Sequence, residues 1–520
     1  MKRTFRLSMA WLHTWVGLLL GWVLFAIFVT GTATYFKGEI TRWMQPEIAG
    51  GVQPLDAARV ALQRLEQVAA DSPRWLVELP DARTAATTLY WQAPGARRFS
   101  SEVIDGVSGG KSRVRETRGG EFFYRFHFQL QLPHPWGRYL AGVAAMFMVV
   151  ALVSGIFTHR QFFKECFTFR PGRNPFRSFL DAHNVTAVLA LPFYLMIAYS
   201  ALVIFGSMYM PWAKRVLQER ESMAGARRVE ARPGTSPLTV HASMPMDQIL
   251  ATVDRTWAPE GRSAKRVEVT GRMGSSPQIV FTRAPARTVA IGGREELRFD
   301  ASTGERVQTE VAPVGPAEQI HNTVYGLHLA RFAHLPLRWM FFVMGVMGTA
   351  LIGTGLILWT VKRRGKAVTP GKAGWGQAVV ERLNVATIAG IFVAIGAFFW
   401  GNRLLPVGFA DRGDTEVYLF LGAWGVALVH ASVRPVLAAW REQLWAAAAL
   451  LASMPLVDAL SGPFLRQALV SGNGAYLGFL ATVVTLGLLL ACAATRVPRQ
   501  WARPAKPQPA TLRILEGASP

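Results

Sequence analysis

The sequence predicts an all-α polytopic membrane bundle of about eight transmembrane helices, with two small α+β modules on one side of the membrane. Hydrophobic residues make up 51% of the 520 residues, and they gather into long runs that are nearly free of charge. Each run has the roughly 17–25 residues that an α-helix needs to cross a bilayer. Two long polar segments interrupt the runs, and they carry mixed helical and alternating hydrophobic patterns.

The expected spans follow one another along the whole chain. They are Met9–Phe36, Tyr139–Phe157, Val185–Met210, Trp339–Thr360, Val385–Gly401, Val417–Val433, Gln443–Leu460 and Gly474–Ala494. The first run is too long for the apolar part of a signal peptide, and it holds a histidine and several tryptophans. We therefore expect it to be an uncleaved membrane anchor.

The net charge of +23 is explained by topology. Basic residues precede the first span and follow the second, fourth and eighth spans, and these segments share one side if both termini are cytoplasmic. Such a bias is the positive-inside rule of a multi-pass protein of the bacterial inner membrane. The lipid bilayer therefore accounts for much of the basic excess, and we expect no nucleic-acid partner.

This topology divides the chain into units. We expect transmembrane segments at 1–36, 139–160, 183–210 and 339–361, periplasmic modules at 37–138 and 211–338, basic cytoplasmic loops at 161–182 and 362–384, four additional helices at 385–494 and a cytoplasmic tail at 495–520. The first module shows helical periodicity over Pro54–Ala70, and the second shows it over Met246–Trp257. Strand-like stretches follow each helix.

The first half of the chain repeats the order span, module, histidine, span. His13 and His183 both stand at the cytoplasmic start of a span, and His127 and His328 both precede the next span. The pairs Arg138 and Arg338, and Ser154-Gly155 and Thr354-Gly355, follow at nearly equal distances. A parallel repeat of this kind predicts a pseudo-twofold axis along the membrane normal.

Nine of the ten histidines fall into two tiers, one at each face of the membrane, and only His241 lies in the middle of a soluble segment. A transmembrane electron path needs a haem near each face, and the two cysteines cannot supply its ligands. On the twofold axis each iron would take one ligand from each half, which pairs His13 with His183 and His127 with His328. His159 is an alternative cytoplasmic ligand. His134, His321 and His334 are expected to be interface residues or contacts on the substrate side.

Several motifs together resemble the PepSY-associated transmembrane family. They are Trp11-Leu-His-Thr-Trp-Val-Gly17, Ser154-Gly-Ile-Phe-Thr-His159, Phe167-Thr-Phe-Arg-Pro-Gly172, Asp181-Ala-His-Asn184, Tyr325-Gly-Leu-His328 and the turn Phe299-Asp-Ala-Ser-Thr-Gly304. The resemblance covers residues 1 to about 365 and identifies the modules as PepSY-like, although the first lacks a clear Thr-Gly turn. The four additional helices lie beyond it.

The resemblance implies a function, because this family includes dihaem ferric-siderophore reductases. It implies two haem b groups, the histidines named above as axial ligands, and reduction of a ferric siderophore in the periplasm for iron acquisition. The chain has no Walker A or dinucleotide-binding motif, so we expect an external electron donor, either a quinol or a soluble reductase. Two alternatives stay open, namely a non-enzymatic PepSY protein that binds or regulates a periplasmic partner, and a component of a siderophore or iron transporter.

Overall fold

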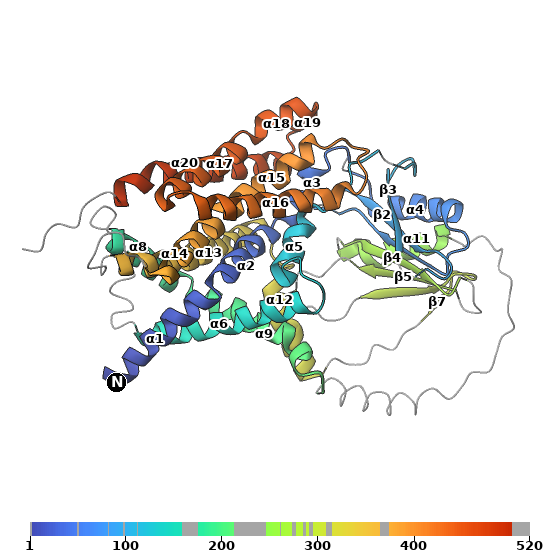
Figure 1. Ribbon diagram of the computed structural model, residues 1–520. Coiled ribbons are helices and arrows are strands. Elements are labelled where there is room, and N and C mark those ends of the chain that lie inside the picture. Colours follow the sequence, from blue (N-terminus) through green and yellow to red (C-terminus); the bar gives the residue numbers. More distant parts are fainter. Residues whose placement is uncertain are drawn as a thin grey trace, which may run out of the picture.

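The protein is an elongated helical bundle with one β-sheet beside one end (Figure 1). The computed structural model describes residues 3–48, 51–81, 83–96, 99–111, 113–158, 175–212, 246–260, 262–272, 277–283, 288–290, 295–307, 315–364 and 374–501. The N-terminus lies at the end of the bundle away from the sheet (Figure 1). We call these two ends the N-terminal end and the sheet end.

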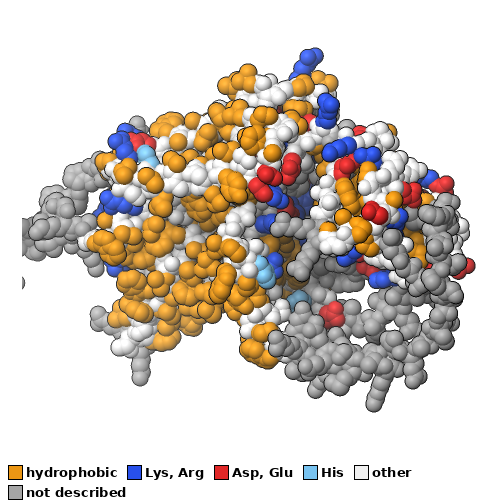
Figure 2. Space-filling model, turned by 45° about the vertical axis from the view of Figure 1, so that its right-hand side comes forward, with side chains coloured by type: hydrophobic (Ala, Val, Ile, Leu, Met, Phe, Trp, Pro, Cys, Tyr) orange, Lys and Arg blue, Asp and Glu red, His pale blue; other side chains and the backbone are white. Residues whose placement is uncertain are grey.

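Six described helical segments are long and apolar enough to cross a membrane, or up to eight if each bent pair counts as one span. The six are α6 (Trp136–Thr158), α9 (Leu191–Tyr209), α13 (Leu335–Arg364), α16 (Arg412–Val433), α20 (Gly474–Trp501), and the segment of α14 (Trp375–Asn384), the π-helical turn η2 (Val385–Ala389) and α15 (Gly390–Leu404). Hydrophobic side chains cover most of the visible bundle surface in Figure 2. The chain is thus a multi-pass helical membrane protein.

Three spans that the sequence predicts as continuous are broken, namely the first, the third and the seventh. The first consists of α1 (Arg3–Leu19) and α2 (Gly21–Thr34), bent by 64°, and the seventh of α17 (Val436–Ala452) and α18 (Met454–Ser461), bent by 42°. Ala190 separates α8 (Pro175–Leu189) from α9 with φ −114° and ψ 19°, as Leu20 separates α1 from α2 with φ −114° and ψ 9°. Hydropathy does not change at these residues, so the apolar pattern alone could not reveal the breaks.

Because of the breaks, the first span of each half of the repeat contacts both halves. At the N-terminal end α1 packs on α6 and α8 packs on α13, each within its own half. Beyond the break α2 packs on α13 and α9 packs on α6, each in the other half. A Cβ at Gly21 would lie 2.7 Å from the Leu356 side chain, so α2 approaches α13 closely only because this residue is glycine.

The two soluble modules share one antiparallel sheet, in the order β3-β2-β1-β4-β5-β6-β7. The strands are β1 (Arg74–Glu78), β2 (Thr87–Gln92), β3 (Phe99–Ile104), β4 (Ala264–Thr270), β5 (Gln278–Arg283), β6 (Glu296–Asp300) and β7 (Arg306–Val307). The helices α4 (Pro54–Val68) and α11 (Met246–Trp257), followed by η1 (Ala258–Glu260), bury one common core against it. The two α+β segments that the sequence predicts are therefore joined in one sheet.

The seam between the modules is the β1–β4 pair, which aligns Trp75 with Val269 and Val77 with Val267. Ion pairs cross it from Arg74 to Glu268 at 2.6 Å, from Glu78 to Arg266 at 3.1 Å and from Asp81 to Lys265. Alone, each module would leave the backbone of β1 or β4 as an unpaired edge. Pairing satisfies both edges and completes the shared core.

The turns that the sequence indicates at Asp105–Gly106 and at Asp300–Gly304 have the same geometry in the two modules. Asp300 accepts backbone hydrogen bonds from Ser302 and Thr303 at 2.8 and 3.0 Å, and Gly304 has φ +74°. In the first module Asp105 accepts from Val107 and Ser108 at 3.0 and 2.7 Å, and Gly109 has φ +71°. The first module therefore keeps the turn, with Ser108-Gly109 in place of Thr-Gly.

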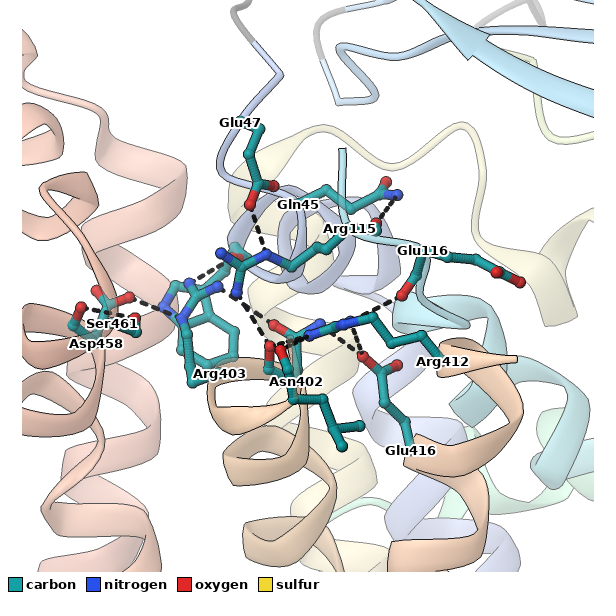
Figure 3. Close-up of polar contacts among 12 residues, drawn as sticks. Gln45, Glu47, Arg115, Glu116, Asn402, Arg403, Arg412, Glu416, Asp458 and Ser461 are labelled. Carbon is teal, nitrogen blue, oxygen red and sulfur yellow. Dashed lines mark hydrogen bonds and ion pairs between the residues drawn. The ribbon is translucent and has the colours of Figure 1, made fainter. Parts of the chain in front are cut away.

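The last helices, α14 to α20, form an accessory bundle that contains buried ion pairs and is joined to the sheet end by hydrogen bonds of buried arginines (Figure 3). Arg403 contacts Asp458 at 2.8 Å and Arg412 contacts Glu416 at 2.6 Å, and all four side chains are fully buried. Arg412 also donates to the Glu116 carbonyl at 2.7 Å, and Arg115 donates to the Asn402 carbonyl at 3.0 Å. The accessory bundle thus holds the segment just before α5 (Gly119–Gln129).

Apolar packing strengthens this attachment. On α5, Phe122 stacks on Phe398 with ring centres 4.7 Å apart, and Phe126 lies 5.6 Å from Phe420. The short helices α3 (Lys37–Met44) and α19 (Phe464–Ser471) complete the contact region, where Arg403 donates to the Trp43 carbonyl at 2.6 Å. One of the two histidine-bearing helices at the sheet end is therefore clamped by the accessory bundle.

Candidate functional site

The structure brings four of the predicted site histidines together as two facing pairs. His13 of α1 and His183 of α8 have ring centres 6.2 Å apart with planes at 75°. His127 of α5 and His328 of α12 (Pro316–Leu329) have ring centres 6.0 Å apart with planes at 39°. The first pair lies at the N-terminal end and the second toward the sheet end, and each pair takes one histidine from each half of the repeat.

Each imidazole is held through its Nδ1 atom. Nδ1 of His13 donates to the Ala151 carbonyl at 2.8 Å, that of His183 to the Leu351 carbonyl at 3.0 Å, and that of His127 to the Ile27 carbonyl at 2.9 Å. A carbonyl oxygen has no hydrogen to give, so Nδ1 must carry the proton in these three rings. Nε2 then keeps its lone pair, which is the form of imidazole that binds a metal.

His328 follows the same arrangement with one addition. Its Nδ1 lies 2.8 Å from Ser200 Oγ and also bonds the backbone of Ile197. Burial, reinforced by the neighbouring His127, lowers the pKa of His328 from 6.5 to about 3. The ring is therefore neutral at physiological pH and able to act as a ligand.

Each carbonyl that accepts a hydrogen bond from a histidine also accepts one from a serine or threonine hydroxyl. Ser154 Oγ bonds the Ala151 carbonyl at 3.1 Å, and Thr354 Oγ1 bonds the Leu351 carbonyl at 3.0 Å. Thr30 and Ser200 repeat the arrangement at the other pair, on the carbonyls of Ile27 and Ile197 at 3.2 and 3.1 Å. The sequence repeat included Ser154 and Thr354, but Thr30 and Ser200 were missed because they lie inside apolar runs.

Glycines make room for the rings. A Cβ at Gly155 would lie 3.2 Å from Cε1 of His13, and one at Gly355 would lie 3.2 Å from Cε1 of His183. At Gly31 the conflict is more severe, because a Cβ would lie 2.4 Å from Nδ1 of His127. Glycine at these positions thus lets the imidazole lie against a helix backbone and reach its carbonyl.

A cavity opens beside each pair. The cavity at the N-terminal end has a volume of about 1010 Å³ and is lined by His13, His183, Trp15 and Trp359, with Lys362 and Arg363 among its basic residues. The other cavity has a volume of about 440 Å³ and is lined by His127 and His328. Both volumes lie in the usual range for cofactor sites. The side chains of Leu24 and Met148 line both cavities, so the two sites adjoin.

The residues fit a haem better than a metal ion held by protein alone. A metal–imidazole bond is about 2 Å long and a ring centre lies about 1 Å beyond the nitrogen, so two imidazoles on opposite sides of one iron have centres about 6 Å apart. Both pairs match this spacing. Among the described residues no group of three or more His, Cys, Asp or Glu side chains converges, whereas a bare ion usually needs about four ligands. A porphyrin would supply the other ligands of the iron.

The other candidate histidines do not join the pairs. His134, His321 and His334 are exposed and line neither cavity, although the His321 ring lies 6.1 Å from that of Tyr325, which lines the cavity at the sheet end. The alternative ligand His159 lies outside the described residues. His430 contacts Glu442 at 2.8 Å in the accessory bundle, away from both pairs.

Comparison with known proteins places these features in one family. The model of the PepSY-associated TM region matches residues 10–362, which include both histidine pairs and both halves of the repeat. A comparison with curated proteins finds none that matches the chain. The accessory bundle lies beyond the matched region. The chain therefore belongs to the family of the PepSY-associated TM region.

Proposed function

We propose that this protein is a dihaem ferric-siderophore reductase of the bacterial inner membrane, which moves electrons from a donor in the membrane or cytoplasm to a ferric chelate in the periplasm. The observation that carries the proposal is the presence of two facing histidine pairs, with ring centres 6.2 and 6.0 Å apart, whose four Nδ1 atoms all hydrogen-bond to the protein. His13 with His183, and His127 with His328, would each hold one haem b.

The protein residues have defined tasks in this function. The carbonyls of Ala151, Leu351 and Ile27 fix the tautomer and the direction of three imidazoles. Leu24 and Met148 line both cavities, so apolar side chains stand between the two histidine pairs. Haem so held supplies a one-electron carrier whose potential depends on its axial ligands and surroundings.

Reduction would release iron because the hard oxygen ligands of a siderophore bind Fe(III) much better than Fe(II). Each ferric ion takes one electron, and the donor, a quinol or a soluble reductase, is oxidised correspondingly. The basic last turn of α13, with Lys362, Arg363 and Arg364, supports a cytoplasmic location for the N-terminal end. The sheet end and the PepSY-like modules would then face the periplasm.

Haem quantitation together with a reduced-minus-oxidised absorption spectrum of the purified protein tests the proposal. We expect two b-type haems per chain in the wild type, one in His13→Ala and one in His328→Ala. His321→Ala is the matched control, because this histidine is exposed and lines neither cavity, and it should retain both haems. The chemically reduced protein should then be reoxidised by a ferric siderophore.

A protein that contains no haem after expression in haem-replete cells would refute the proposal. The seven-stranded sheet would then become the main functional feature, as a device that binds or regulates a periplasmic partner. Retention of both haems in His13→Ala and in His328→Ala would refute the ligand assignment alone.

A further inference from the structure

The cavity that contains His127 and His328 is lined by cations without any lining carboxylate. Its basic residues are Lys37, Arg83, Arg138, Arg331 and Arg338, and its lining includes no Asp or Glu among the residues described. We call these five residues the cationic mouth. A concave surface lined by one sign of charge focuses its field and concentrates ligands of the opposite sign.

Three cations of the mouth have partners just outside the cavity. Lys37 contacts Glu121 at 2.8 Å, while Arg83 and Arg338 share Glu39 at 3.3 and 2.6 Å. The five cations of the mouth are thus balanced by only two carboxylates, those of Glu39 and Glu121. The mouth therefore keeps a net positive charge.

Arg138 and Arg331 are the two cations whose described contacts include no carboxylate. Arg138 reaches the neutral Gln129 side chain at 3.4 Å and lies over the Phe128 ring at 5.2 Å. Arg331 is exposed and follows Ala330, whose φ of +49° ends α12. The described contacts of these two arginines therefore do not use the ability of a guanidinium group to bind an anion through two hydrogen bonds.

Two tyrosines add hydrogen-bond donors to the same mouth. Tyr124 and Tyr325 both line the cavity, each one turn before a histidine of the pair. Tyr124 lies within electrostatic range of Arg138, Arg331 and Tyr325. Burial raises the pKa of Tyr124 above its ordinary value, so its hydroxyl stays protonated and able to donate.

We propose that Arg138 and Arg331, with Tyr124 and Tyr325, bind a negatively charged ferric chelate at this mouth, so that the substrate class is anionic and not neutral or cationic. The proposal rests on the proposed function, since it names the chelate that would be reduced there. A haem would bring two propionates of its own. Even with these added to Glu39 and Glu121, the cations outnumber the carboxylates.

Gallium(III) complexes test the site without any redox reaction, because gallium(III) copies the size and charge of iron(III) but is not reduced. Purified full-length protein is titrated calorimetrically with an anionic gallium tris-catecholate and with a neutral gallium trihydroxamate. We expect the anionic complex to bind at least about tenfold more tightly, and its binding to weaken as salt rises because exposed charges are screened.

Arg331→Gln should weaken binding of the anionic complex by about tenfold or more, since a hydrogen bond to a charged group has that order of effect. Arg331→Lys keeps the charge and should restore part of the loss. The matched control is Arg255→Gln on α11, whose described contacts are the local Ala251 carbonyl and Thr252. This control should bind like the wild type.

Two results would overturn the inference. The first is equal affinity for the two gallium complexes, or an Arg331→Gln variant that binds like the wild type. The second is the loss of one haem per chain in Arg331→Gln, which would assign the arginine to haem propionates. Haem content is measured on the same samples, so a protein without haem that still binds the anionic complex would refute the proposed function and leave this site standing.

Discussion

At the scale of single residues, one arrangement occurs four times. A histidine ring faces its partner, and its Nδ1 bonds the backbone of a neighbouring helix at Ala151, Leu351, Ile27 or Ile197. A hydroxyl three residues further along that helix bonds the same carbonyl. Backbone acceptors in transmembrane helices are rigid, and they fix the ring direction before any metal binds.

The two pairs differ in the angle between their rings, which leads to a spectroscopic prediction. The planes of His13 and His183 meet at 75°, and those of His127 and His328 meet at 39°. Nearly perpendicular imidazoles make two iron d orbitals almost equal in energy, which increases the anisotropy of a low-spin ferric centre. Electron paramagnetic resonance of the oxidised protein should therefore show two low-spin signals, the more anisotropic from His13 and His183.

Single substitutions assign these signals. His183→Ala should remove the more anisotropic signal and His127→Ala the other, while His321→Ala, exposed and outside both cavities, should keep both. Two signals of equal anisotropy would contradict the ring geometry described here.

At the scale of elements, the two helices at the sheet end that carry histidines are held differently. Phe122, Phe123 and Phe126 of α5 are buried against the accessory bundle, and the segment before α5 is held by Arg412 and Glu416. On α12 Gly326 is buried, His328 is half-buried, and Pro316–His321 are exposed. The accessory bundle therefore stabilises one of the two histidine-bearing helices at the sheet end.

Arg412→Ala should destabilise the protein by about 3–5 kcal/mol, because it leaves Glu416 buried without its partner. Arg412 also holds the Glu116 carbonyl just before α5. We therefore expect the haem absorbance that depends on His127 and His328 to be lost at a lower temperature than the haem absorbance that depends on His13 and His183. Thermal unfolding of the purified protein, followed by intrinsic fluorescence and haem absorbance, measures both effects.

The matched control is Arg434→Ala in the same bundle. Arg434 pairs with Glu442, but the two side chains are 50% and 32% exposed, so its removal should destabilise the protein far less than the removal of Arg412. Equal destabilisation by the two variants would show that the buried network does not hold the bundle in place.

At the scale of the whole molecule, the repeat makes a nearly symmetric core to which the accessory bundle adds asymmetry. The modules complete each other across the β1–β4 seam, and the broken helices carry each half into contact with the other. The core therefore acts as one unit, with the soluble sheet at one end and the basic turn of α13 at the other.

This arrangement predicts the sidedness of two exposed residues in a cysteine-free background, Cys166→Ser with Cys492→Ser. Arg255→Cys, on α11 beside the sheet, should react with a membrane-impermeant maleimide in intact spheroplasts. Trp375→Cys, at the start of α14 and 85% exposed, should react only after the membrane is permeabilised. Labelling in the reverse order would invert the proposed direction of electron flow.

The sequence by itself determined the apolar spans, the repeat and the pairing of the histidines. These features depend on local composition and on matching positions along the chain, so His13 with His183 and His127 with His328 could be predicted before any coordinates. Equal separations along the chain also align Leu20 with Ala190 and Thr30 with Ser200. Pro192 is a local signal for the helix break at Ala190, but no such signal stands at Leu20, and neither hydroxyl reveals its hydrogen bond.

Tertiary structure alone decided the shared sheet, the helix break at Leu20, the backbone acceptors and the buried arginines. Arg412 meets the Glu116 carbonyl across 296 positions, and β1 finds its partner in a strand of the other module. A backbone carbonyl is the same group in every residue, so the sequence cannot show which one will accept a particular side chain. Only packing determines which helices approach, and it is this packing that turns four separate histidines into two facing pairs.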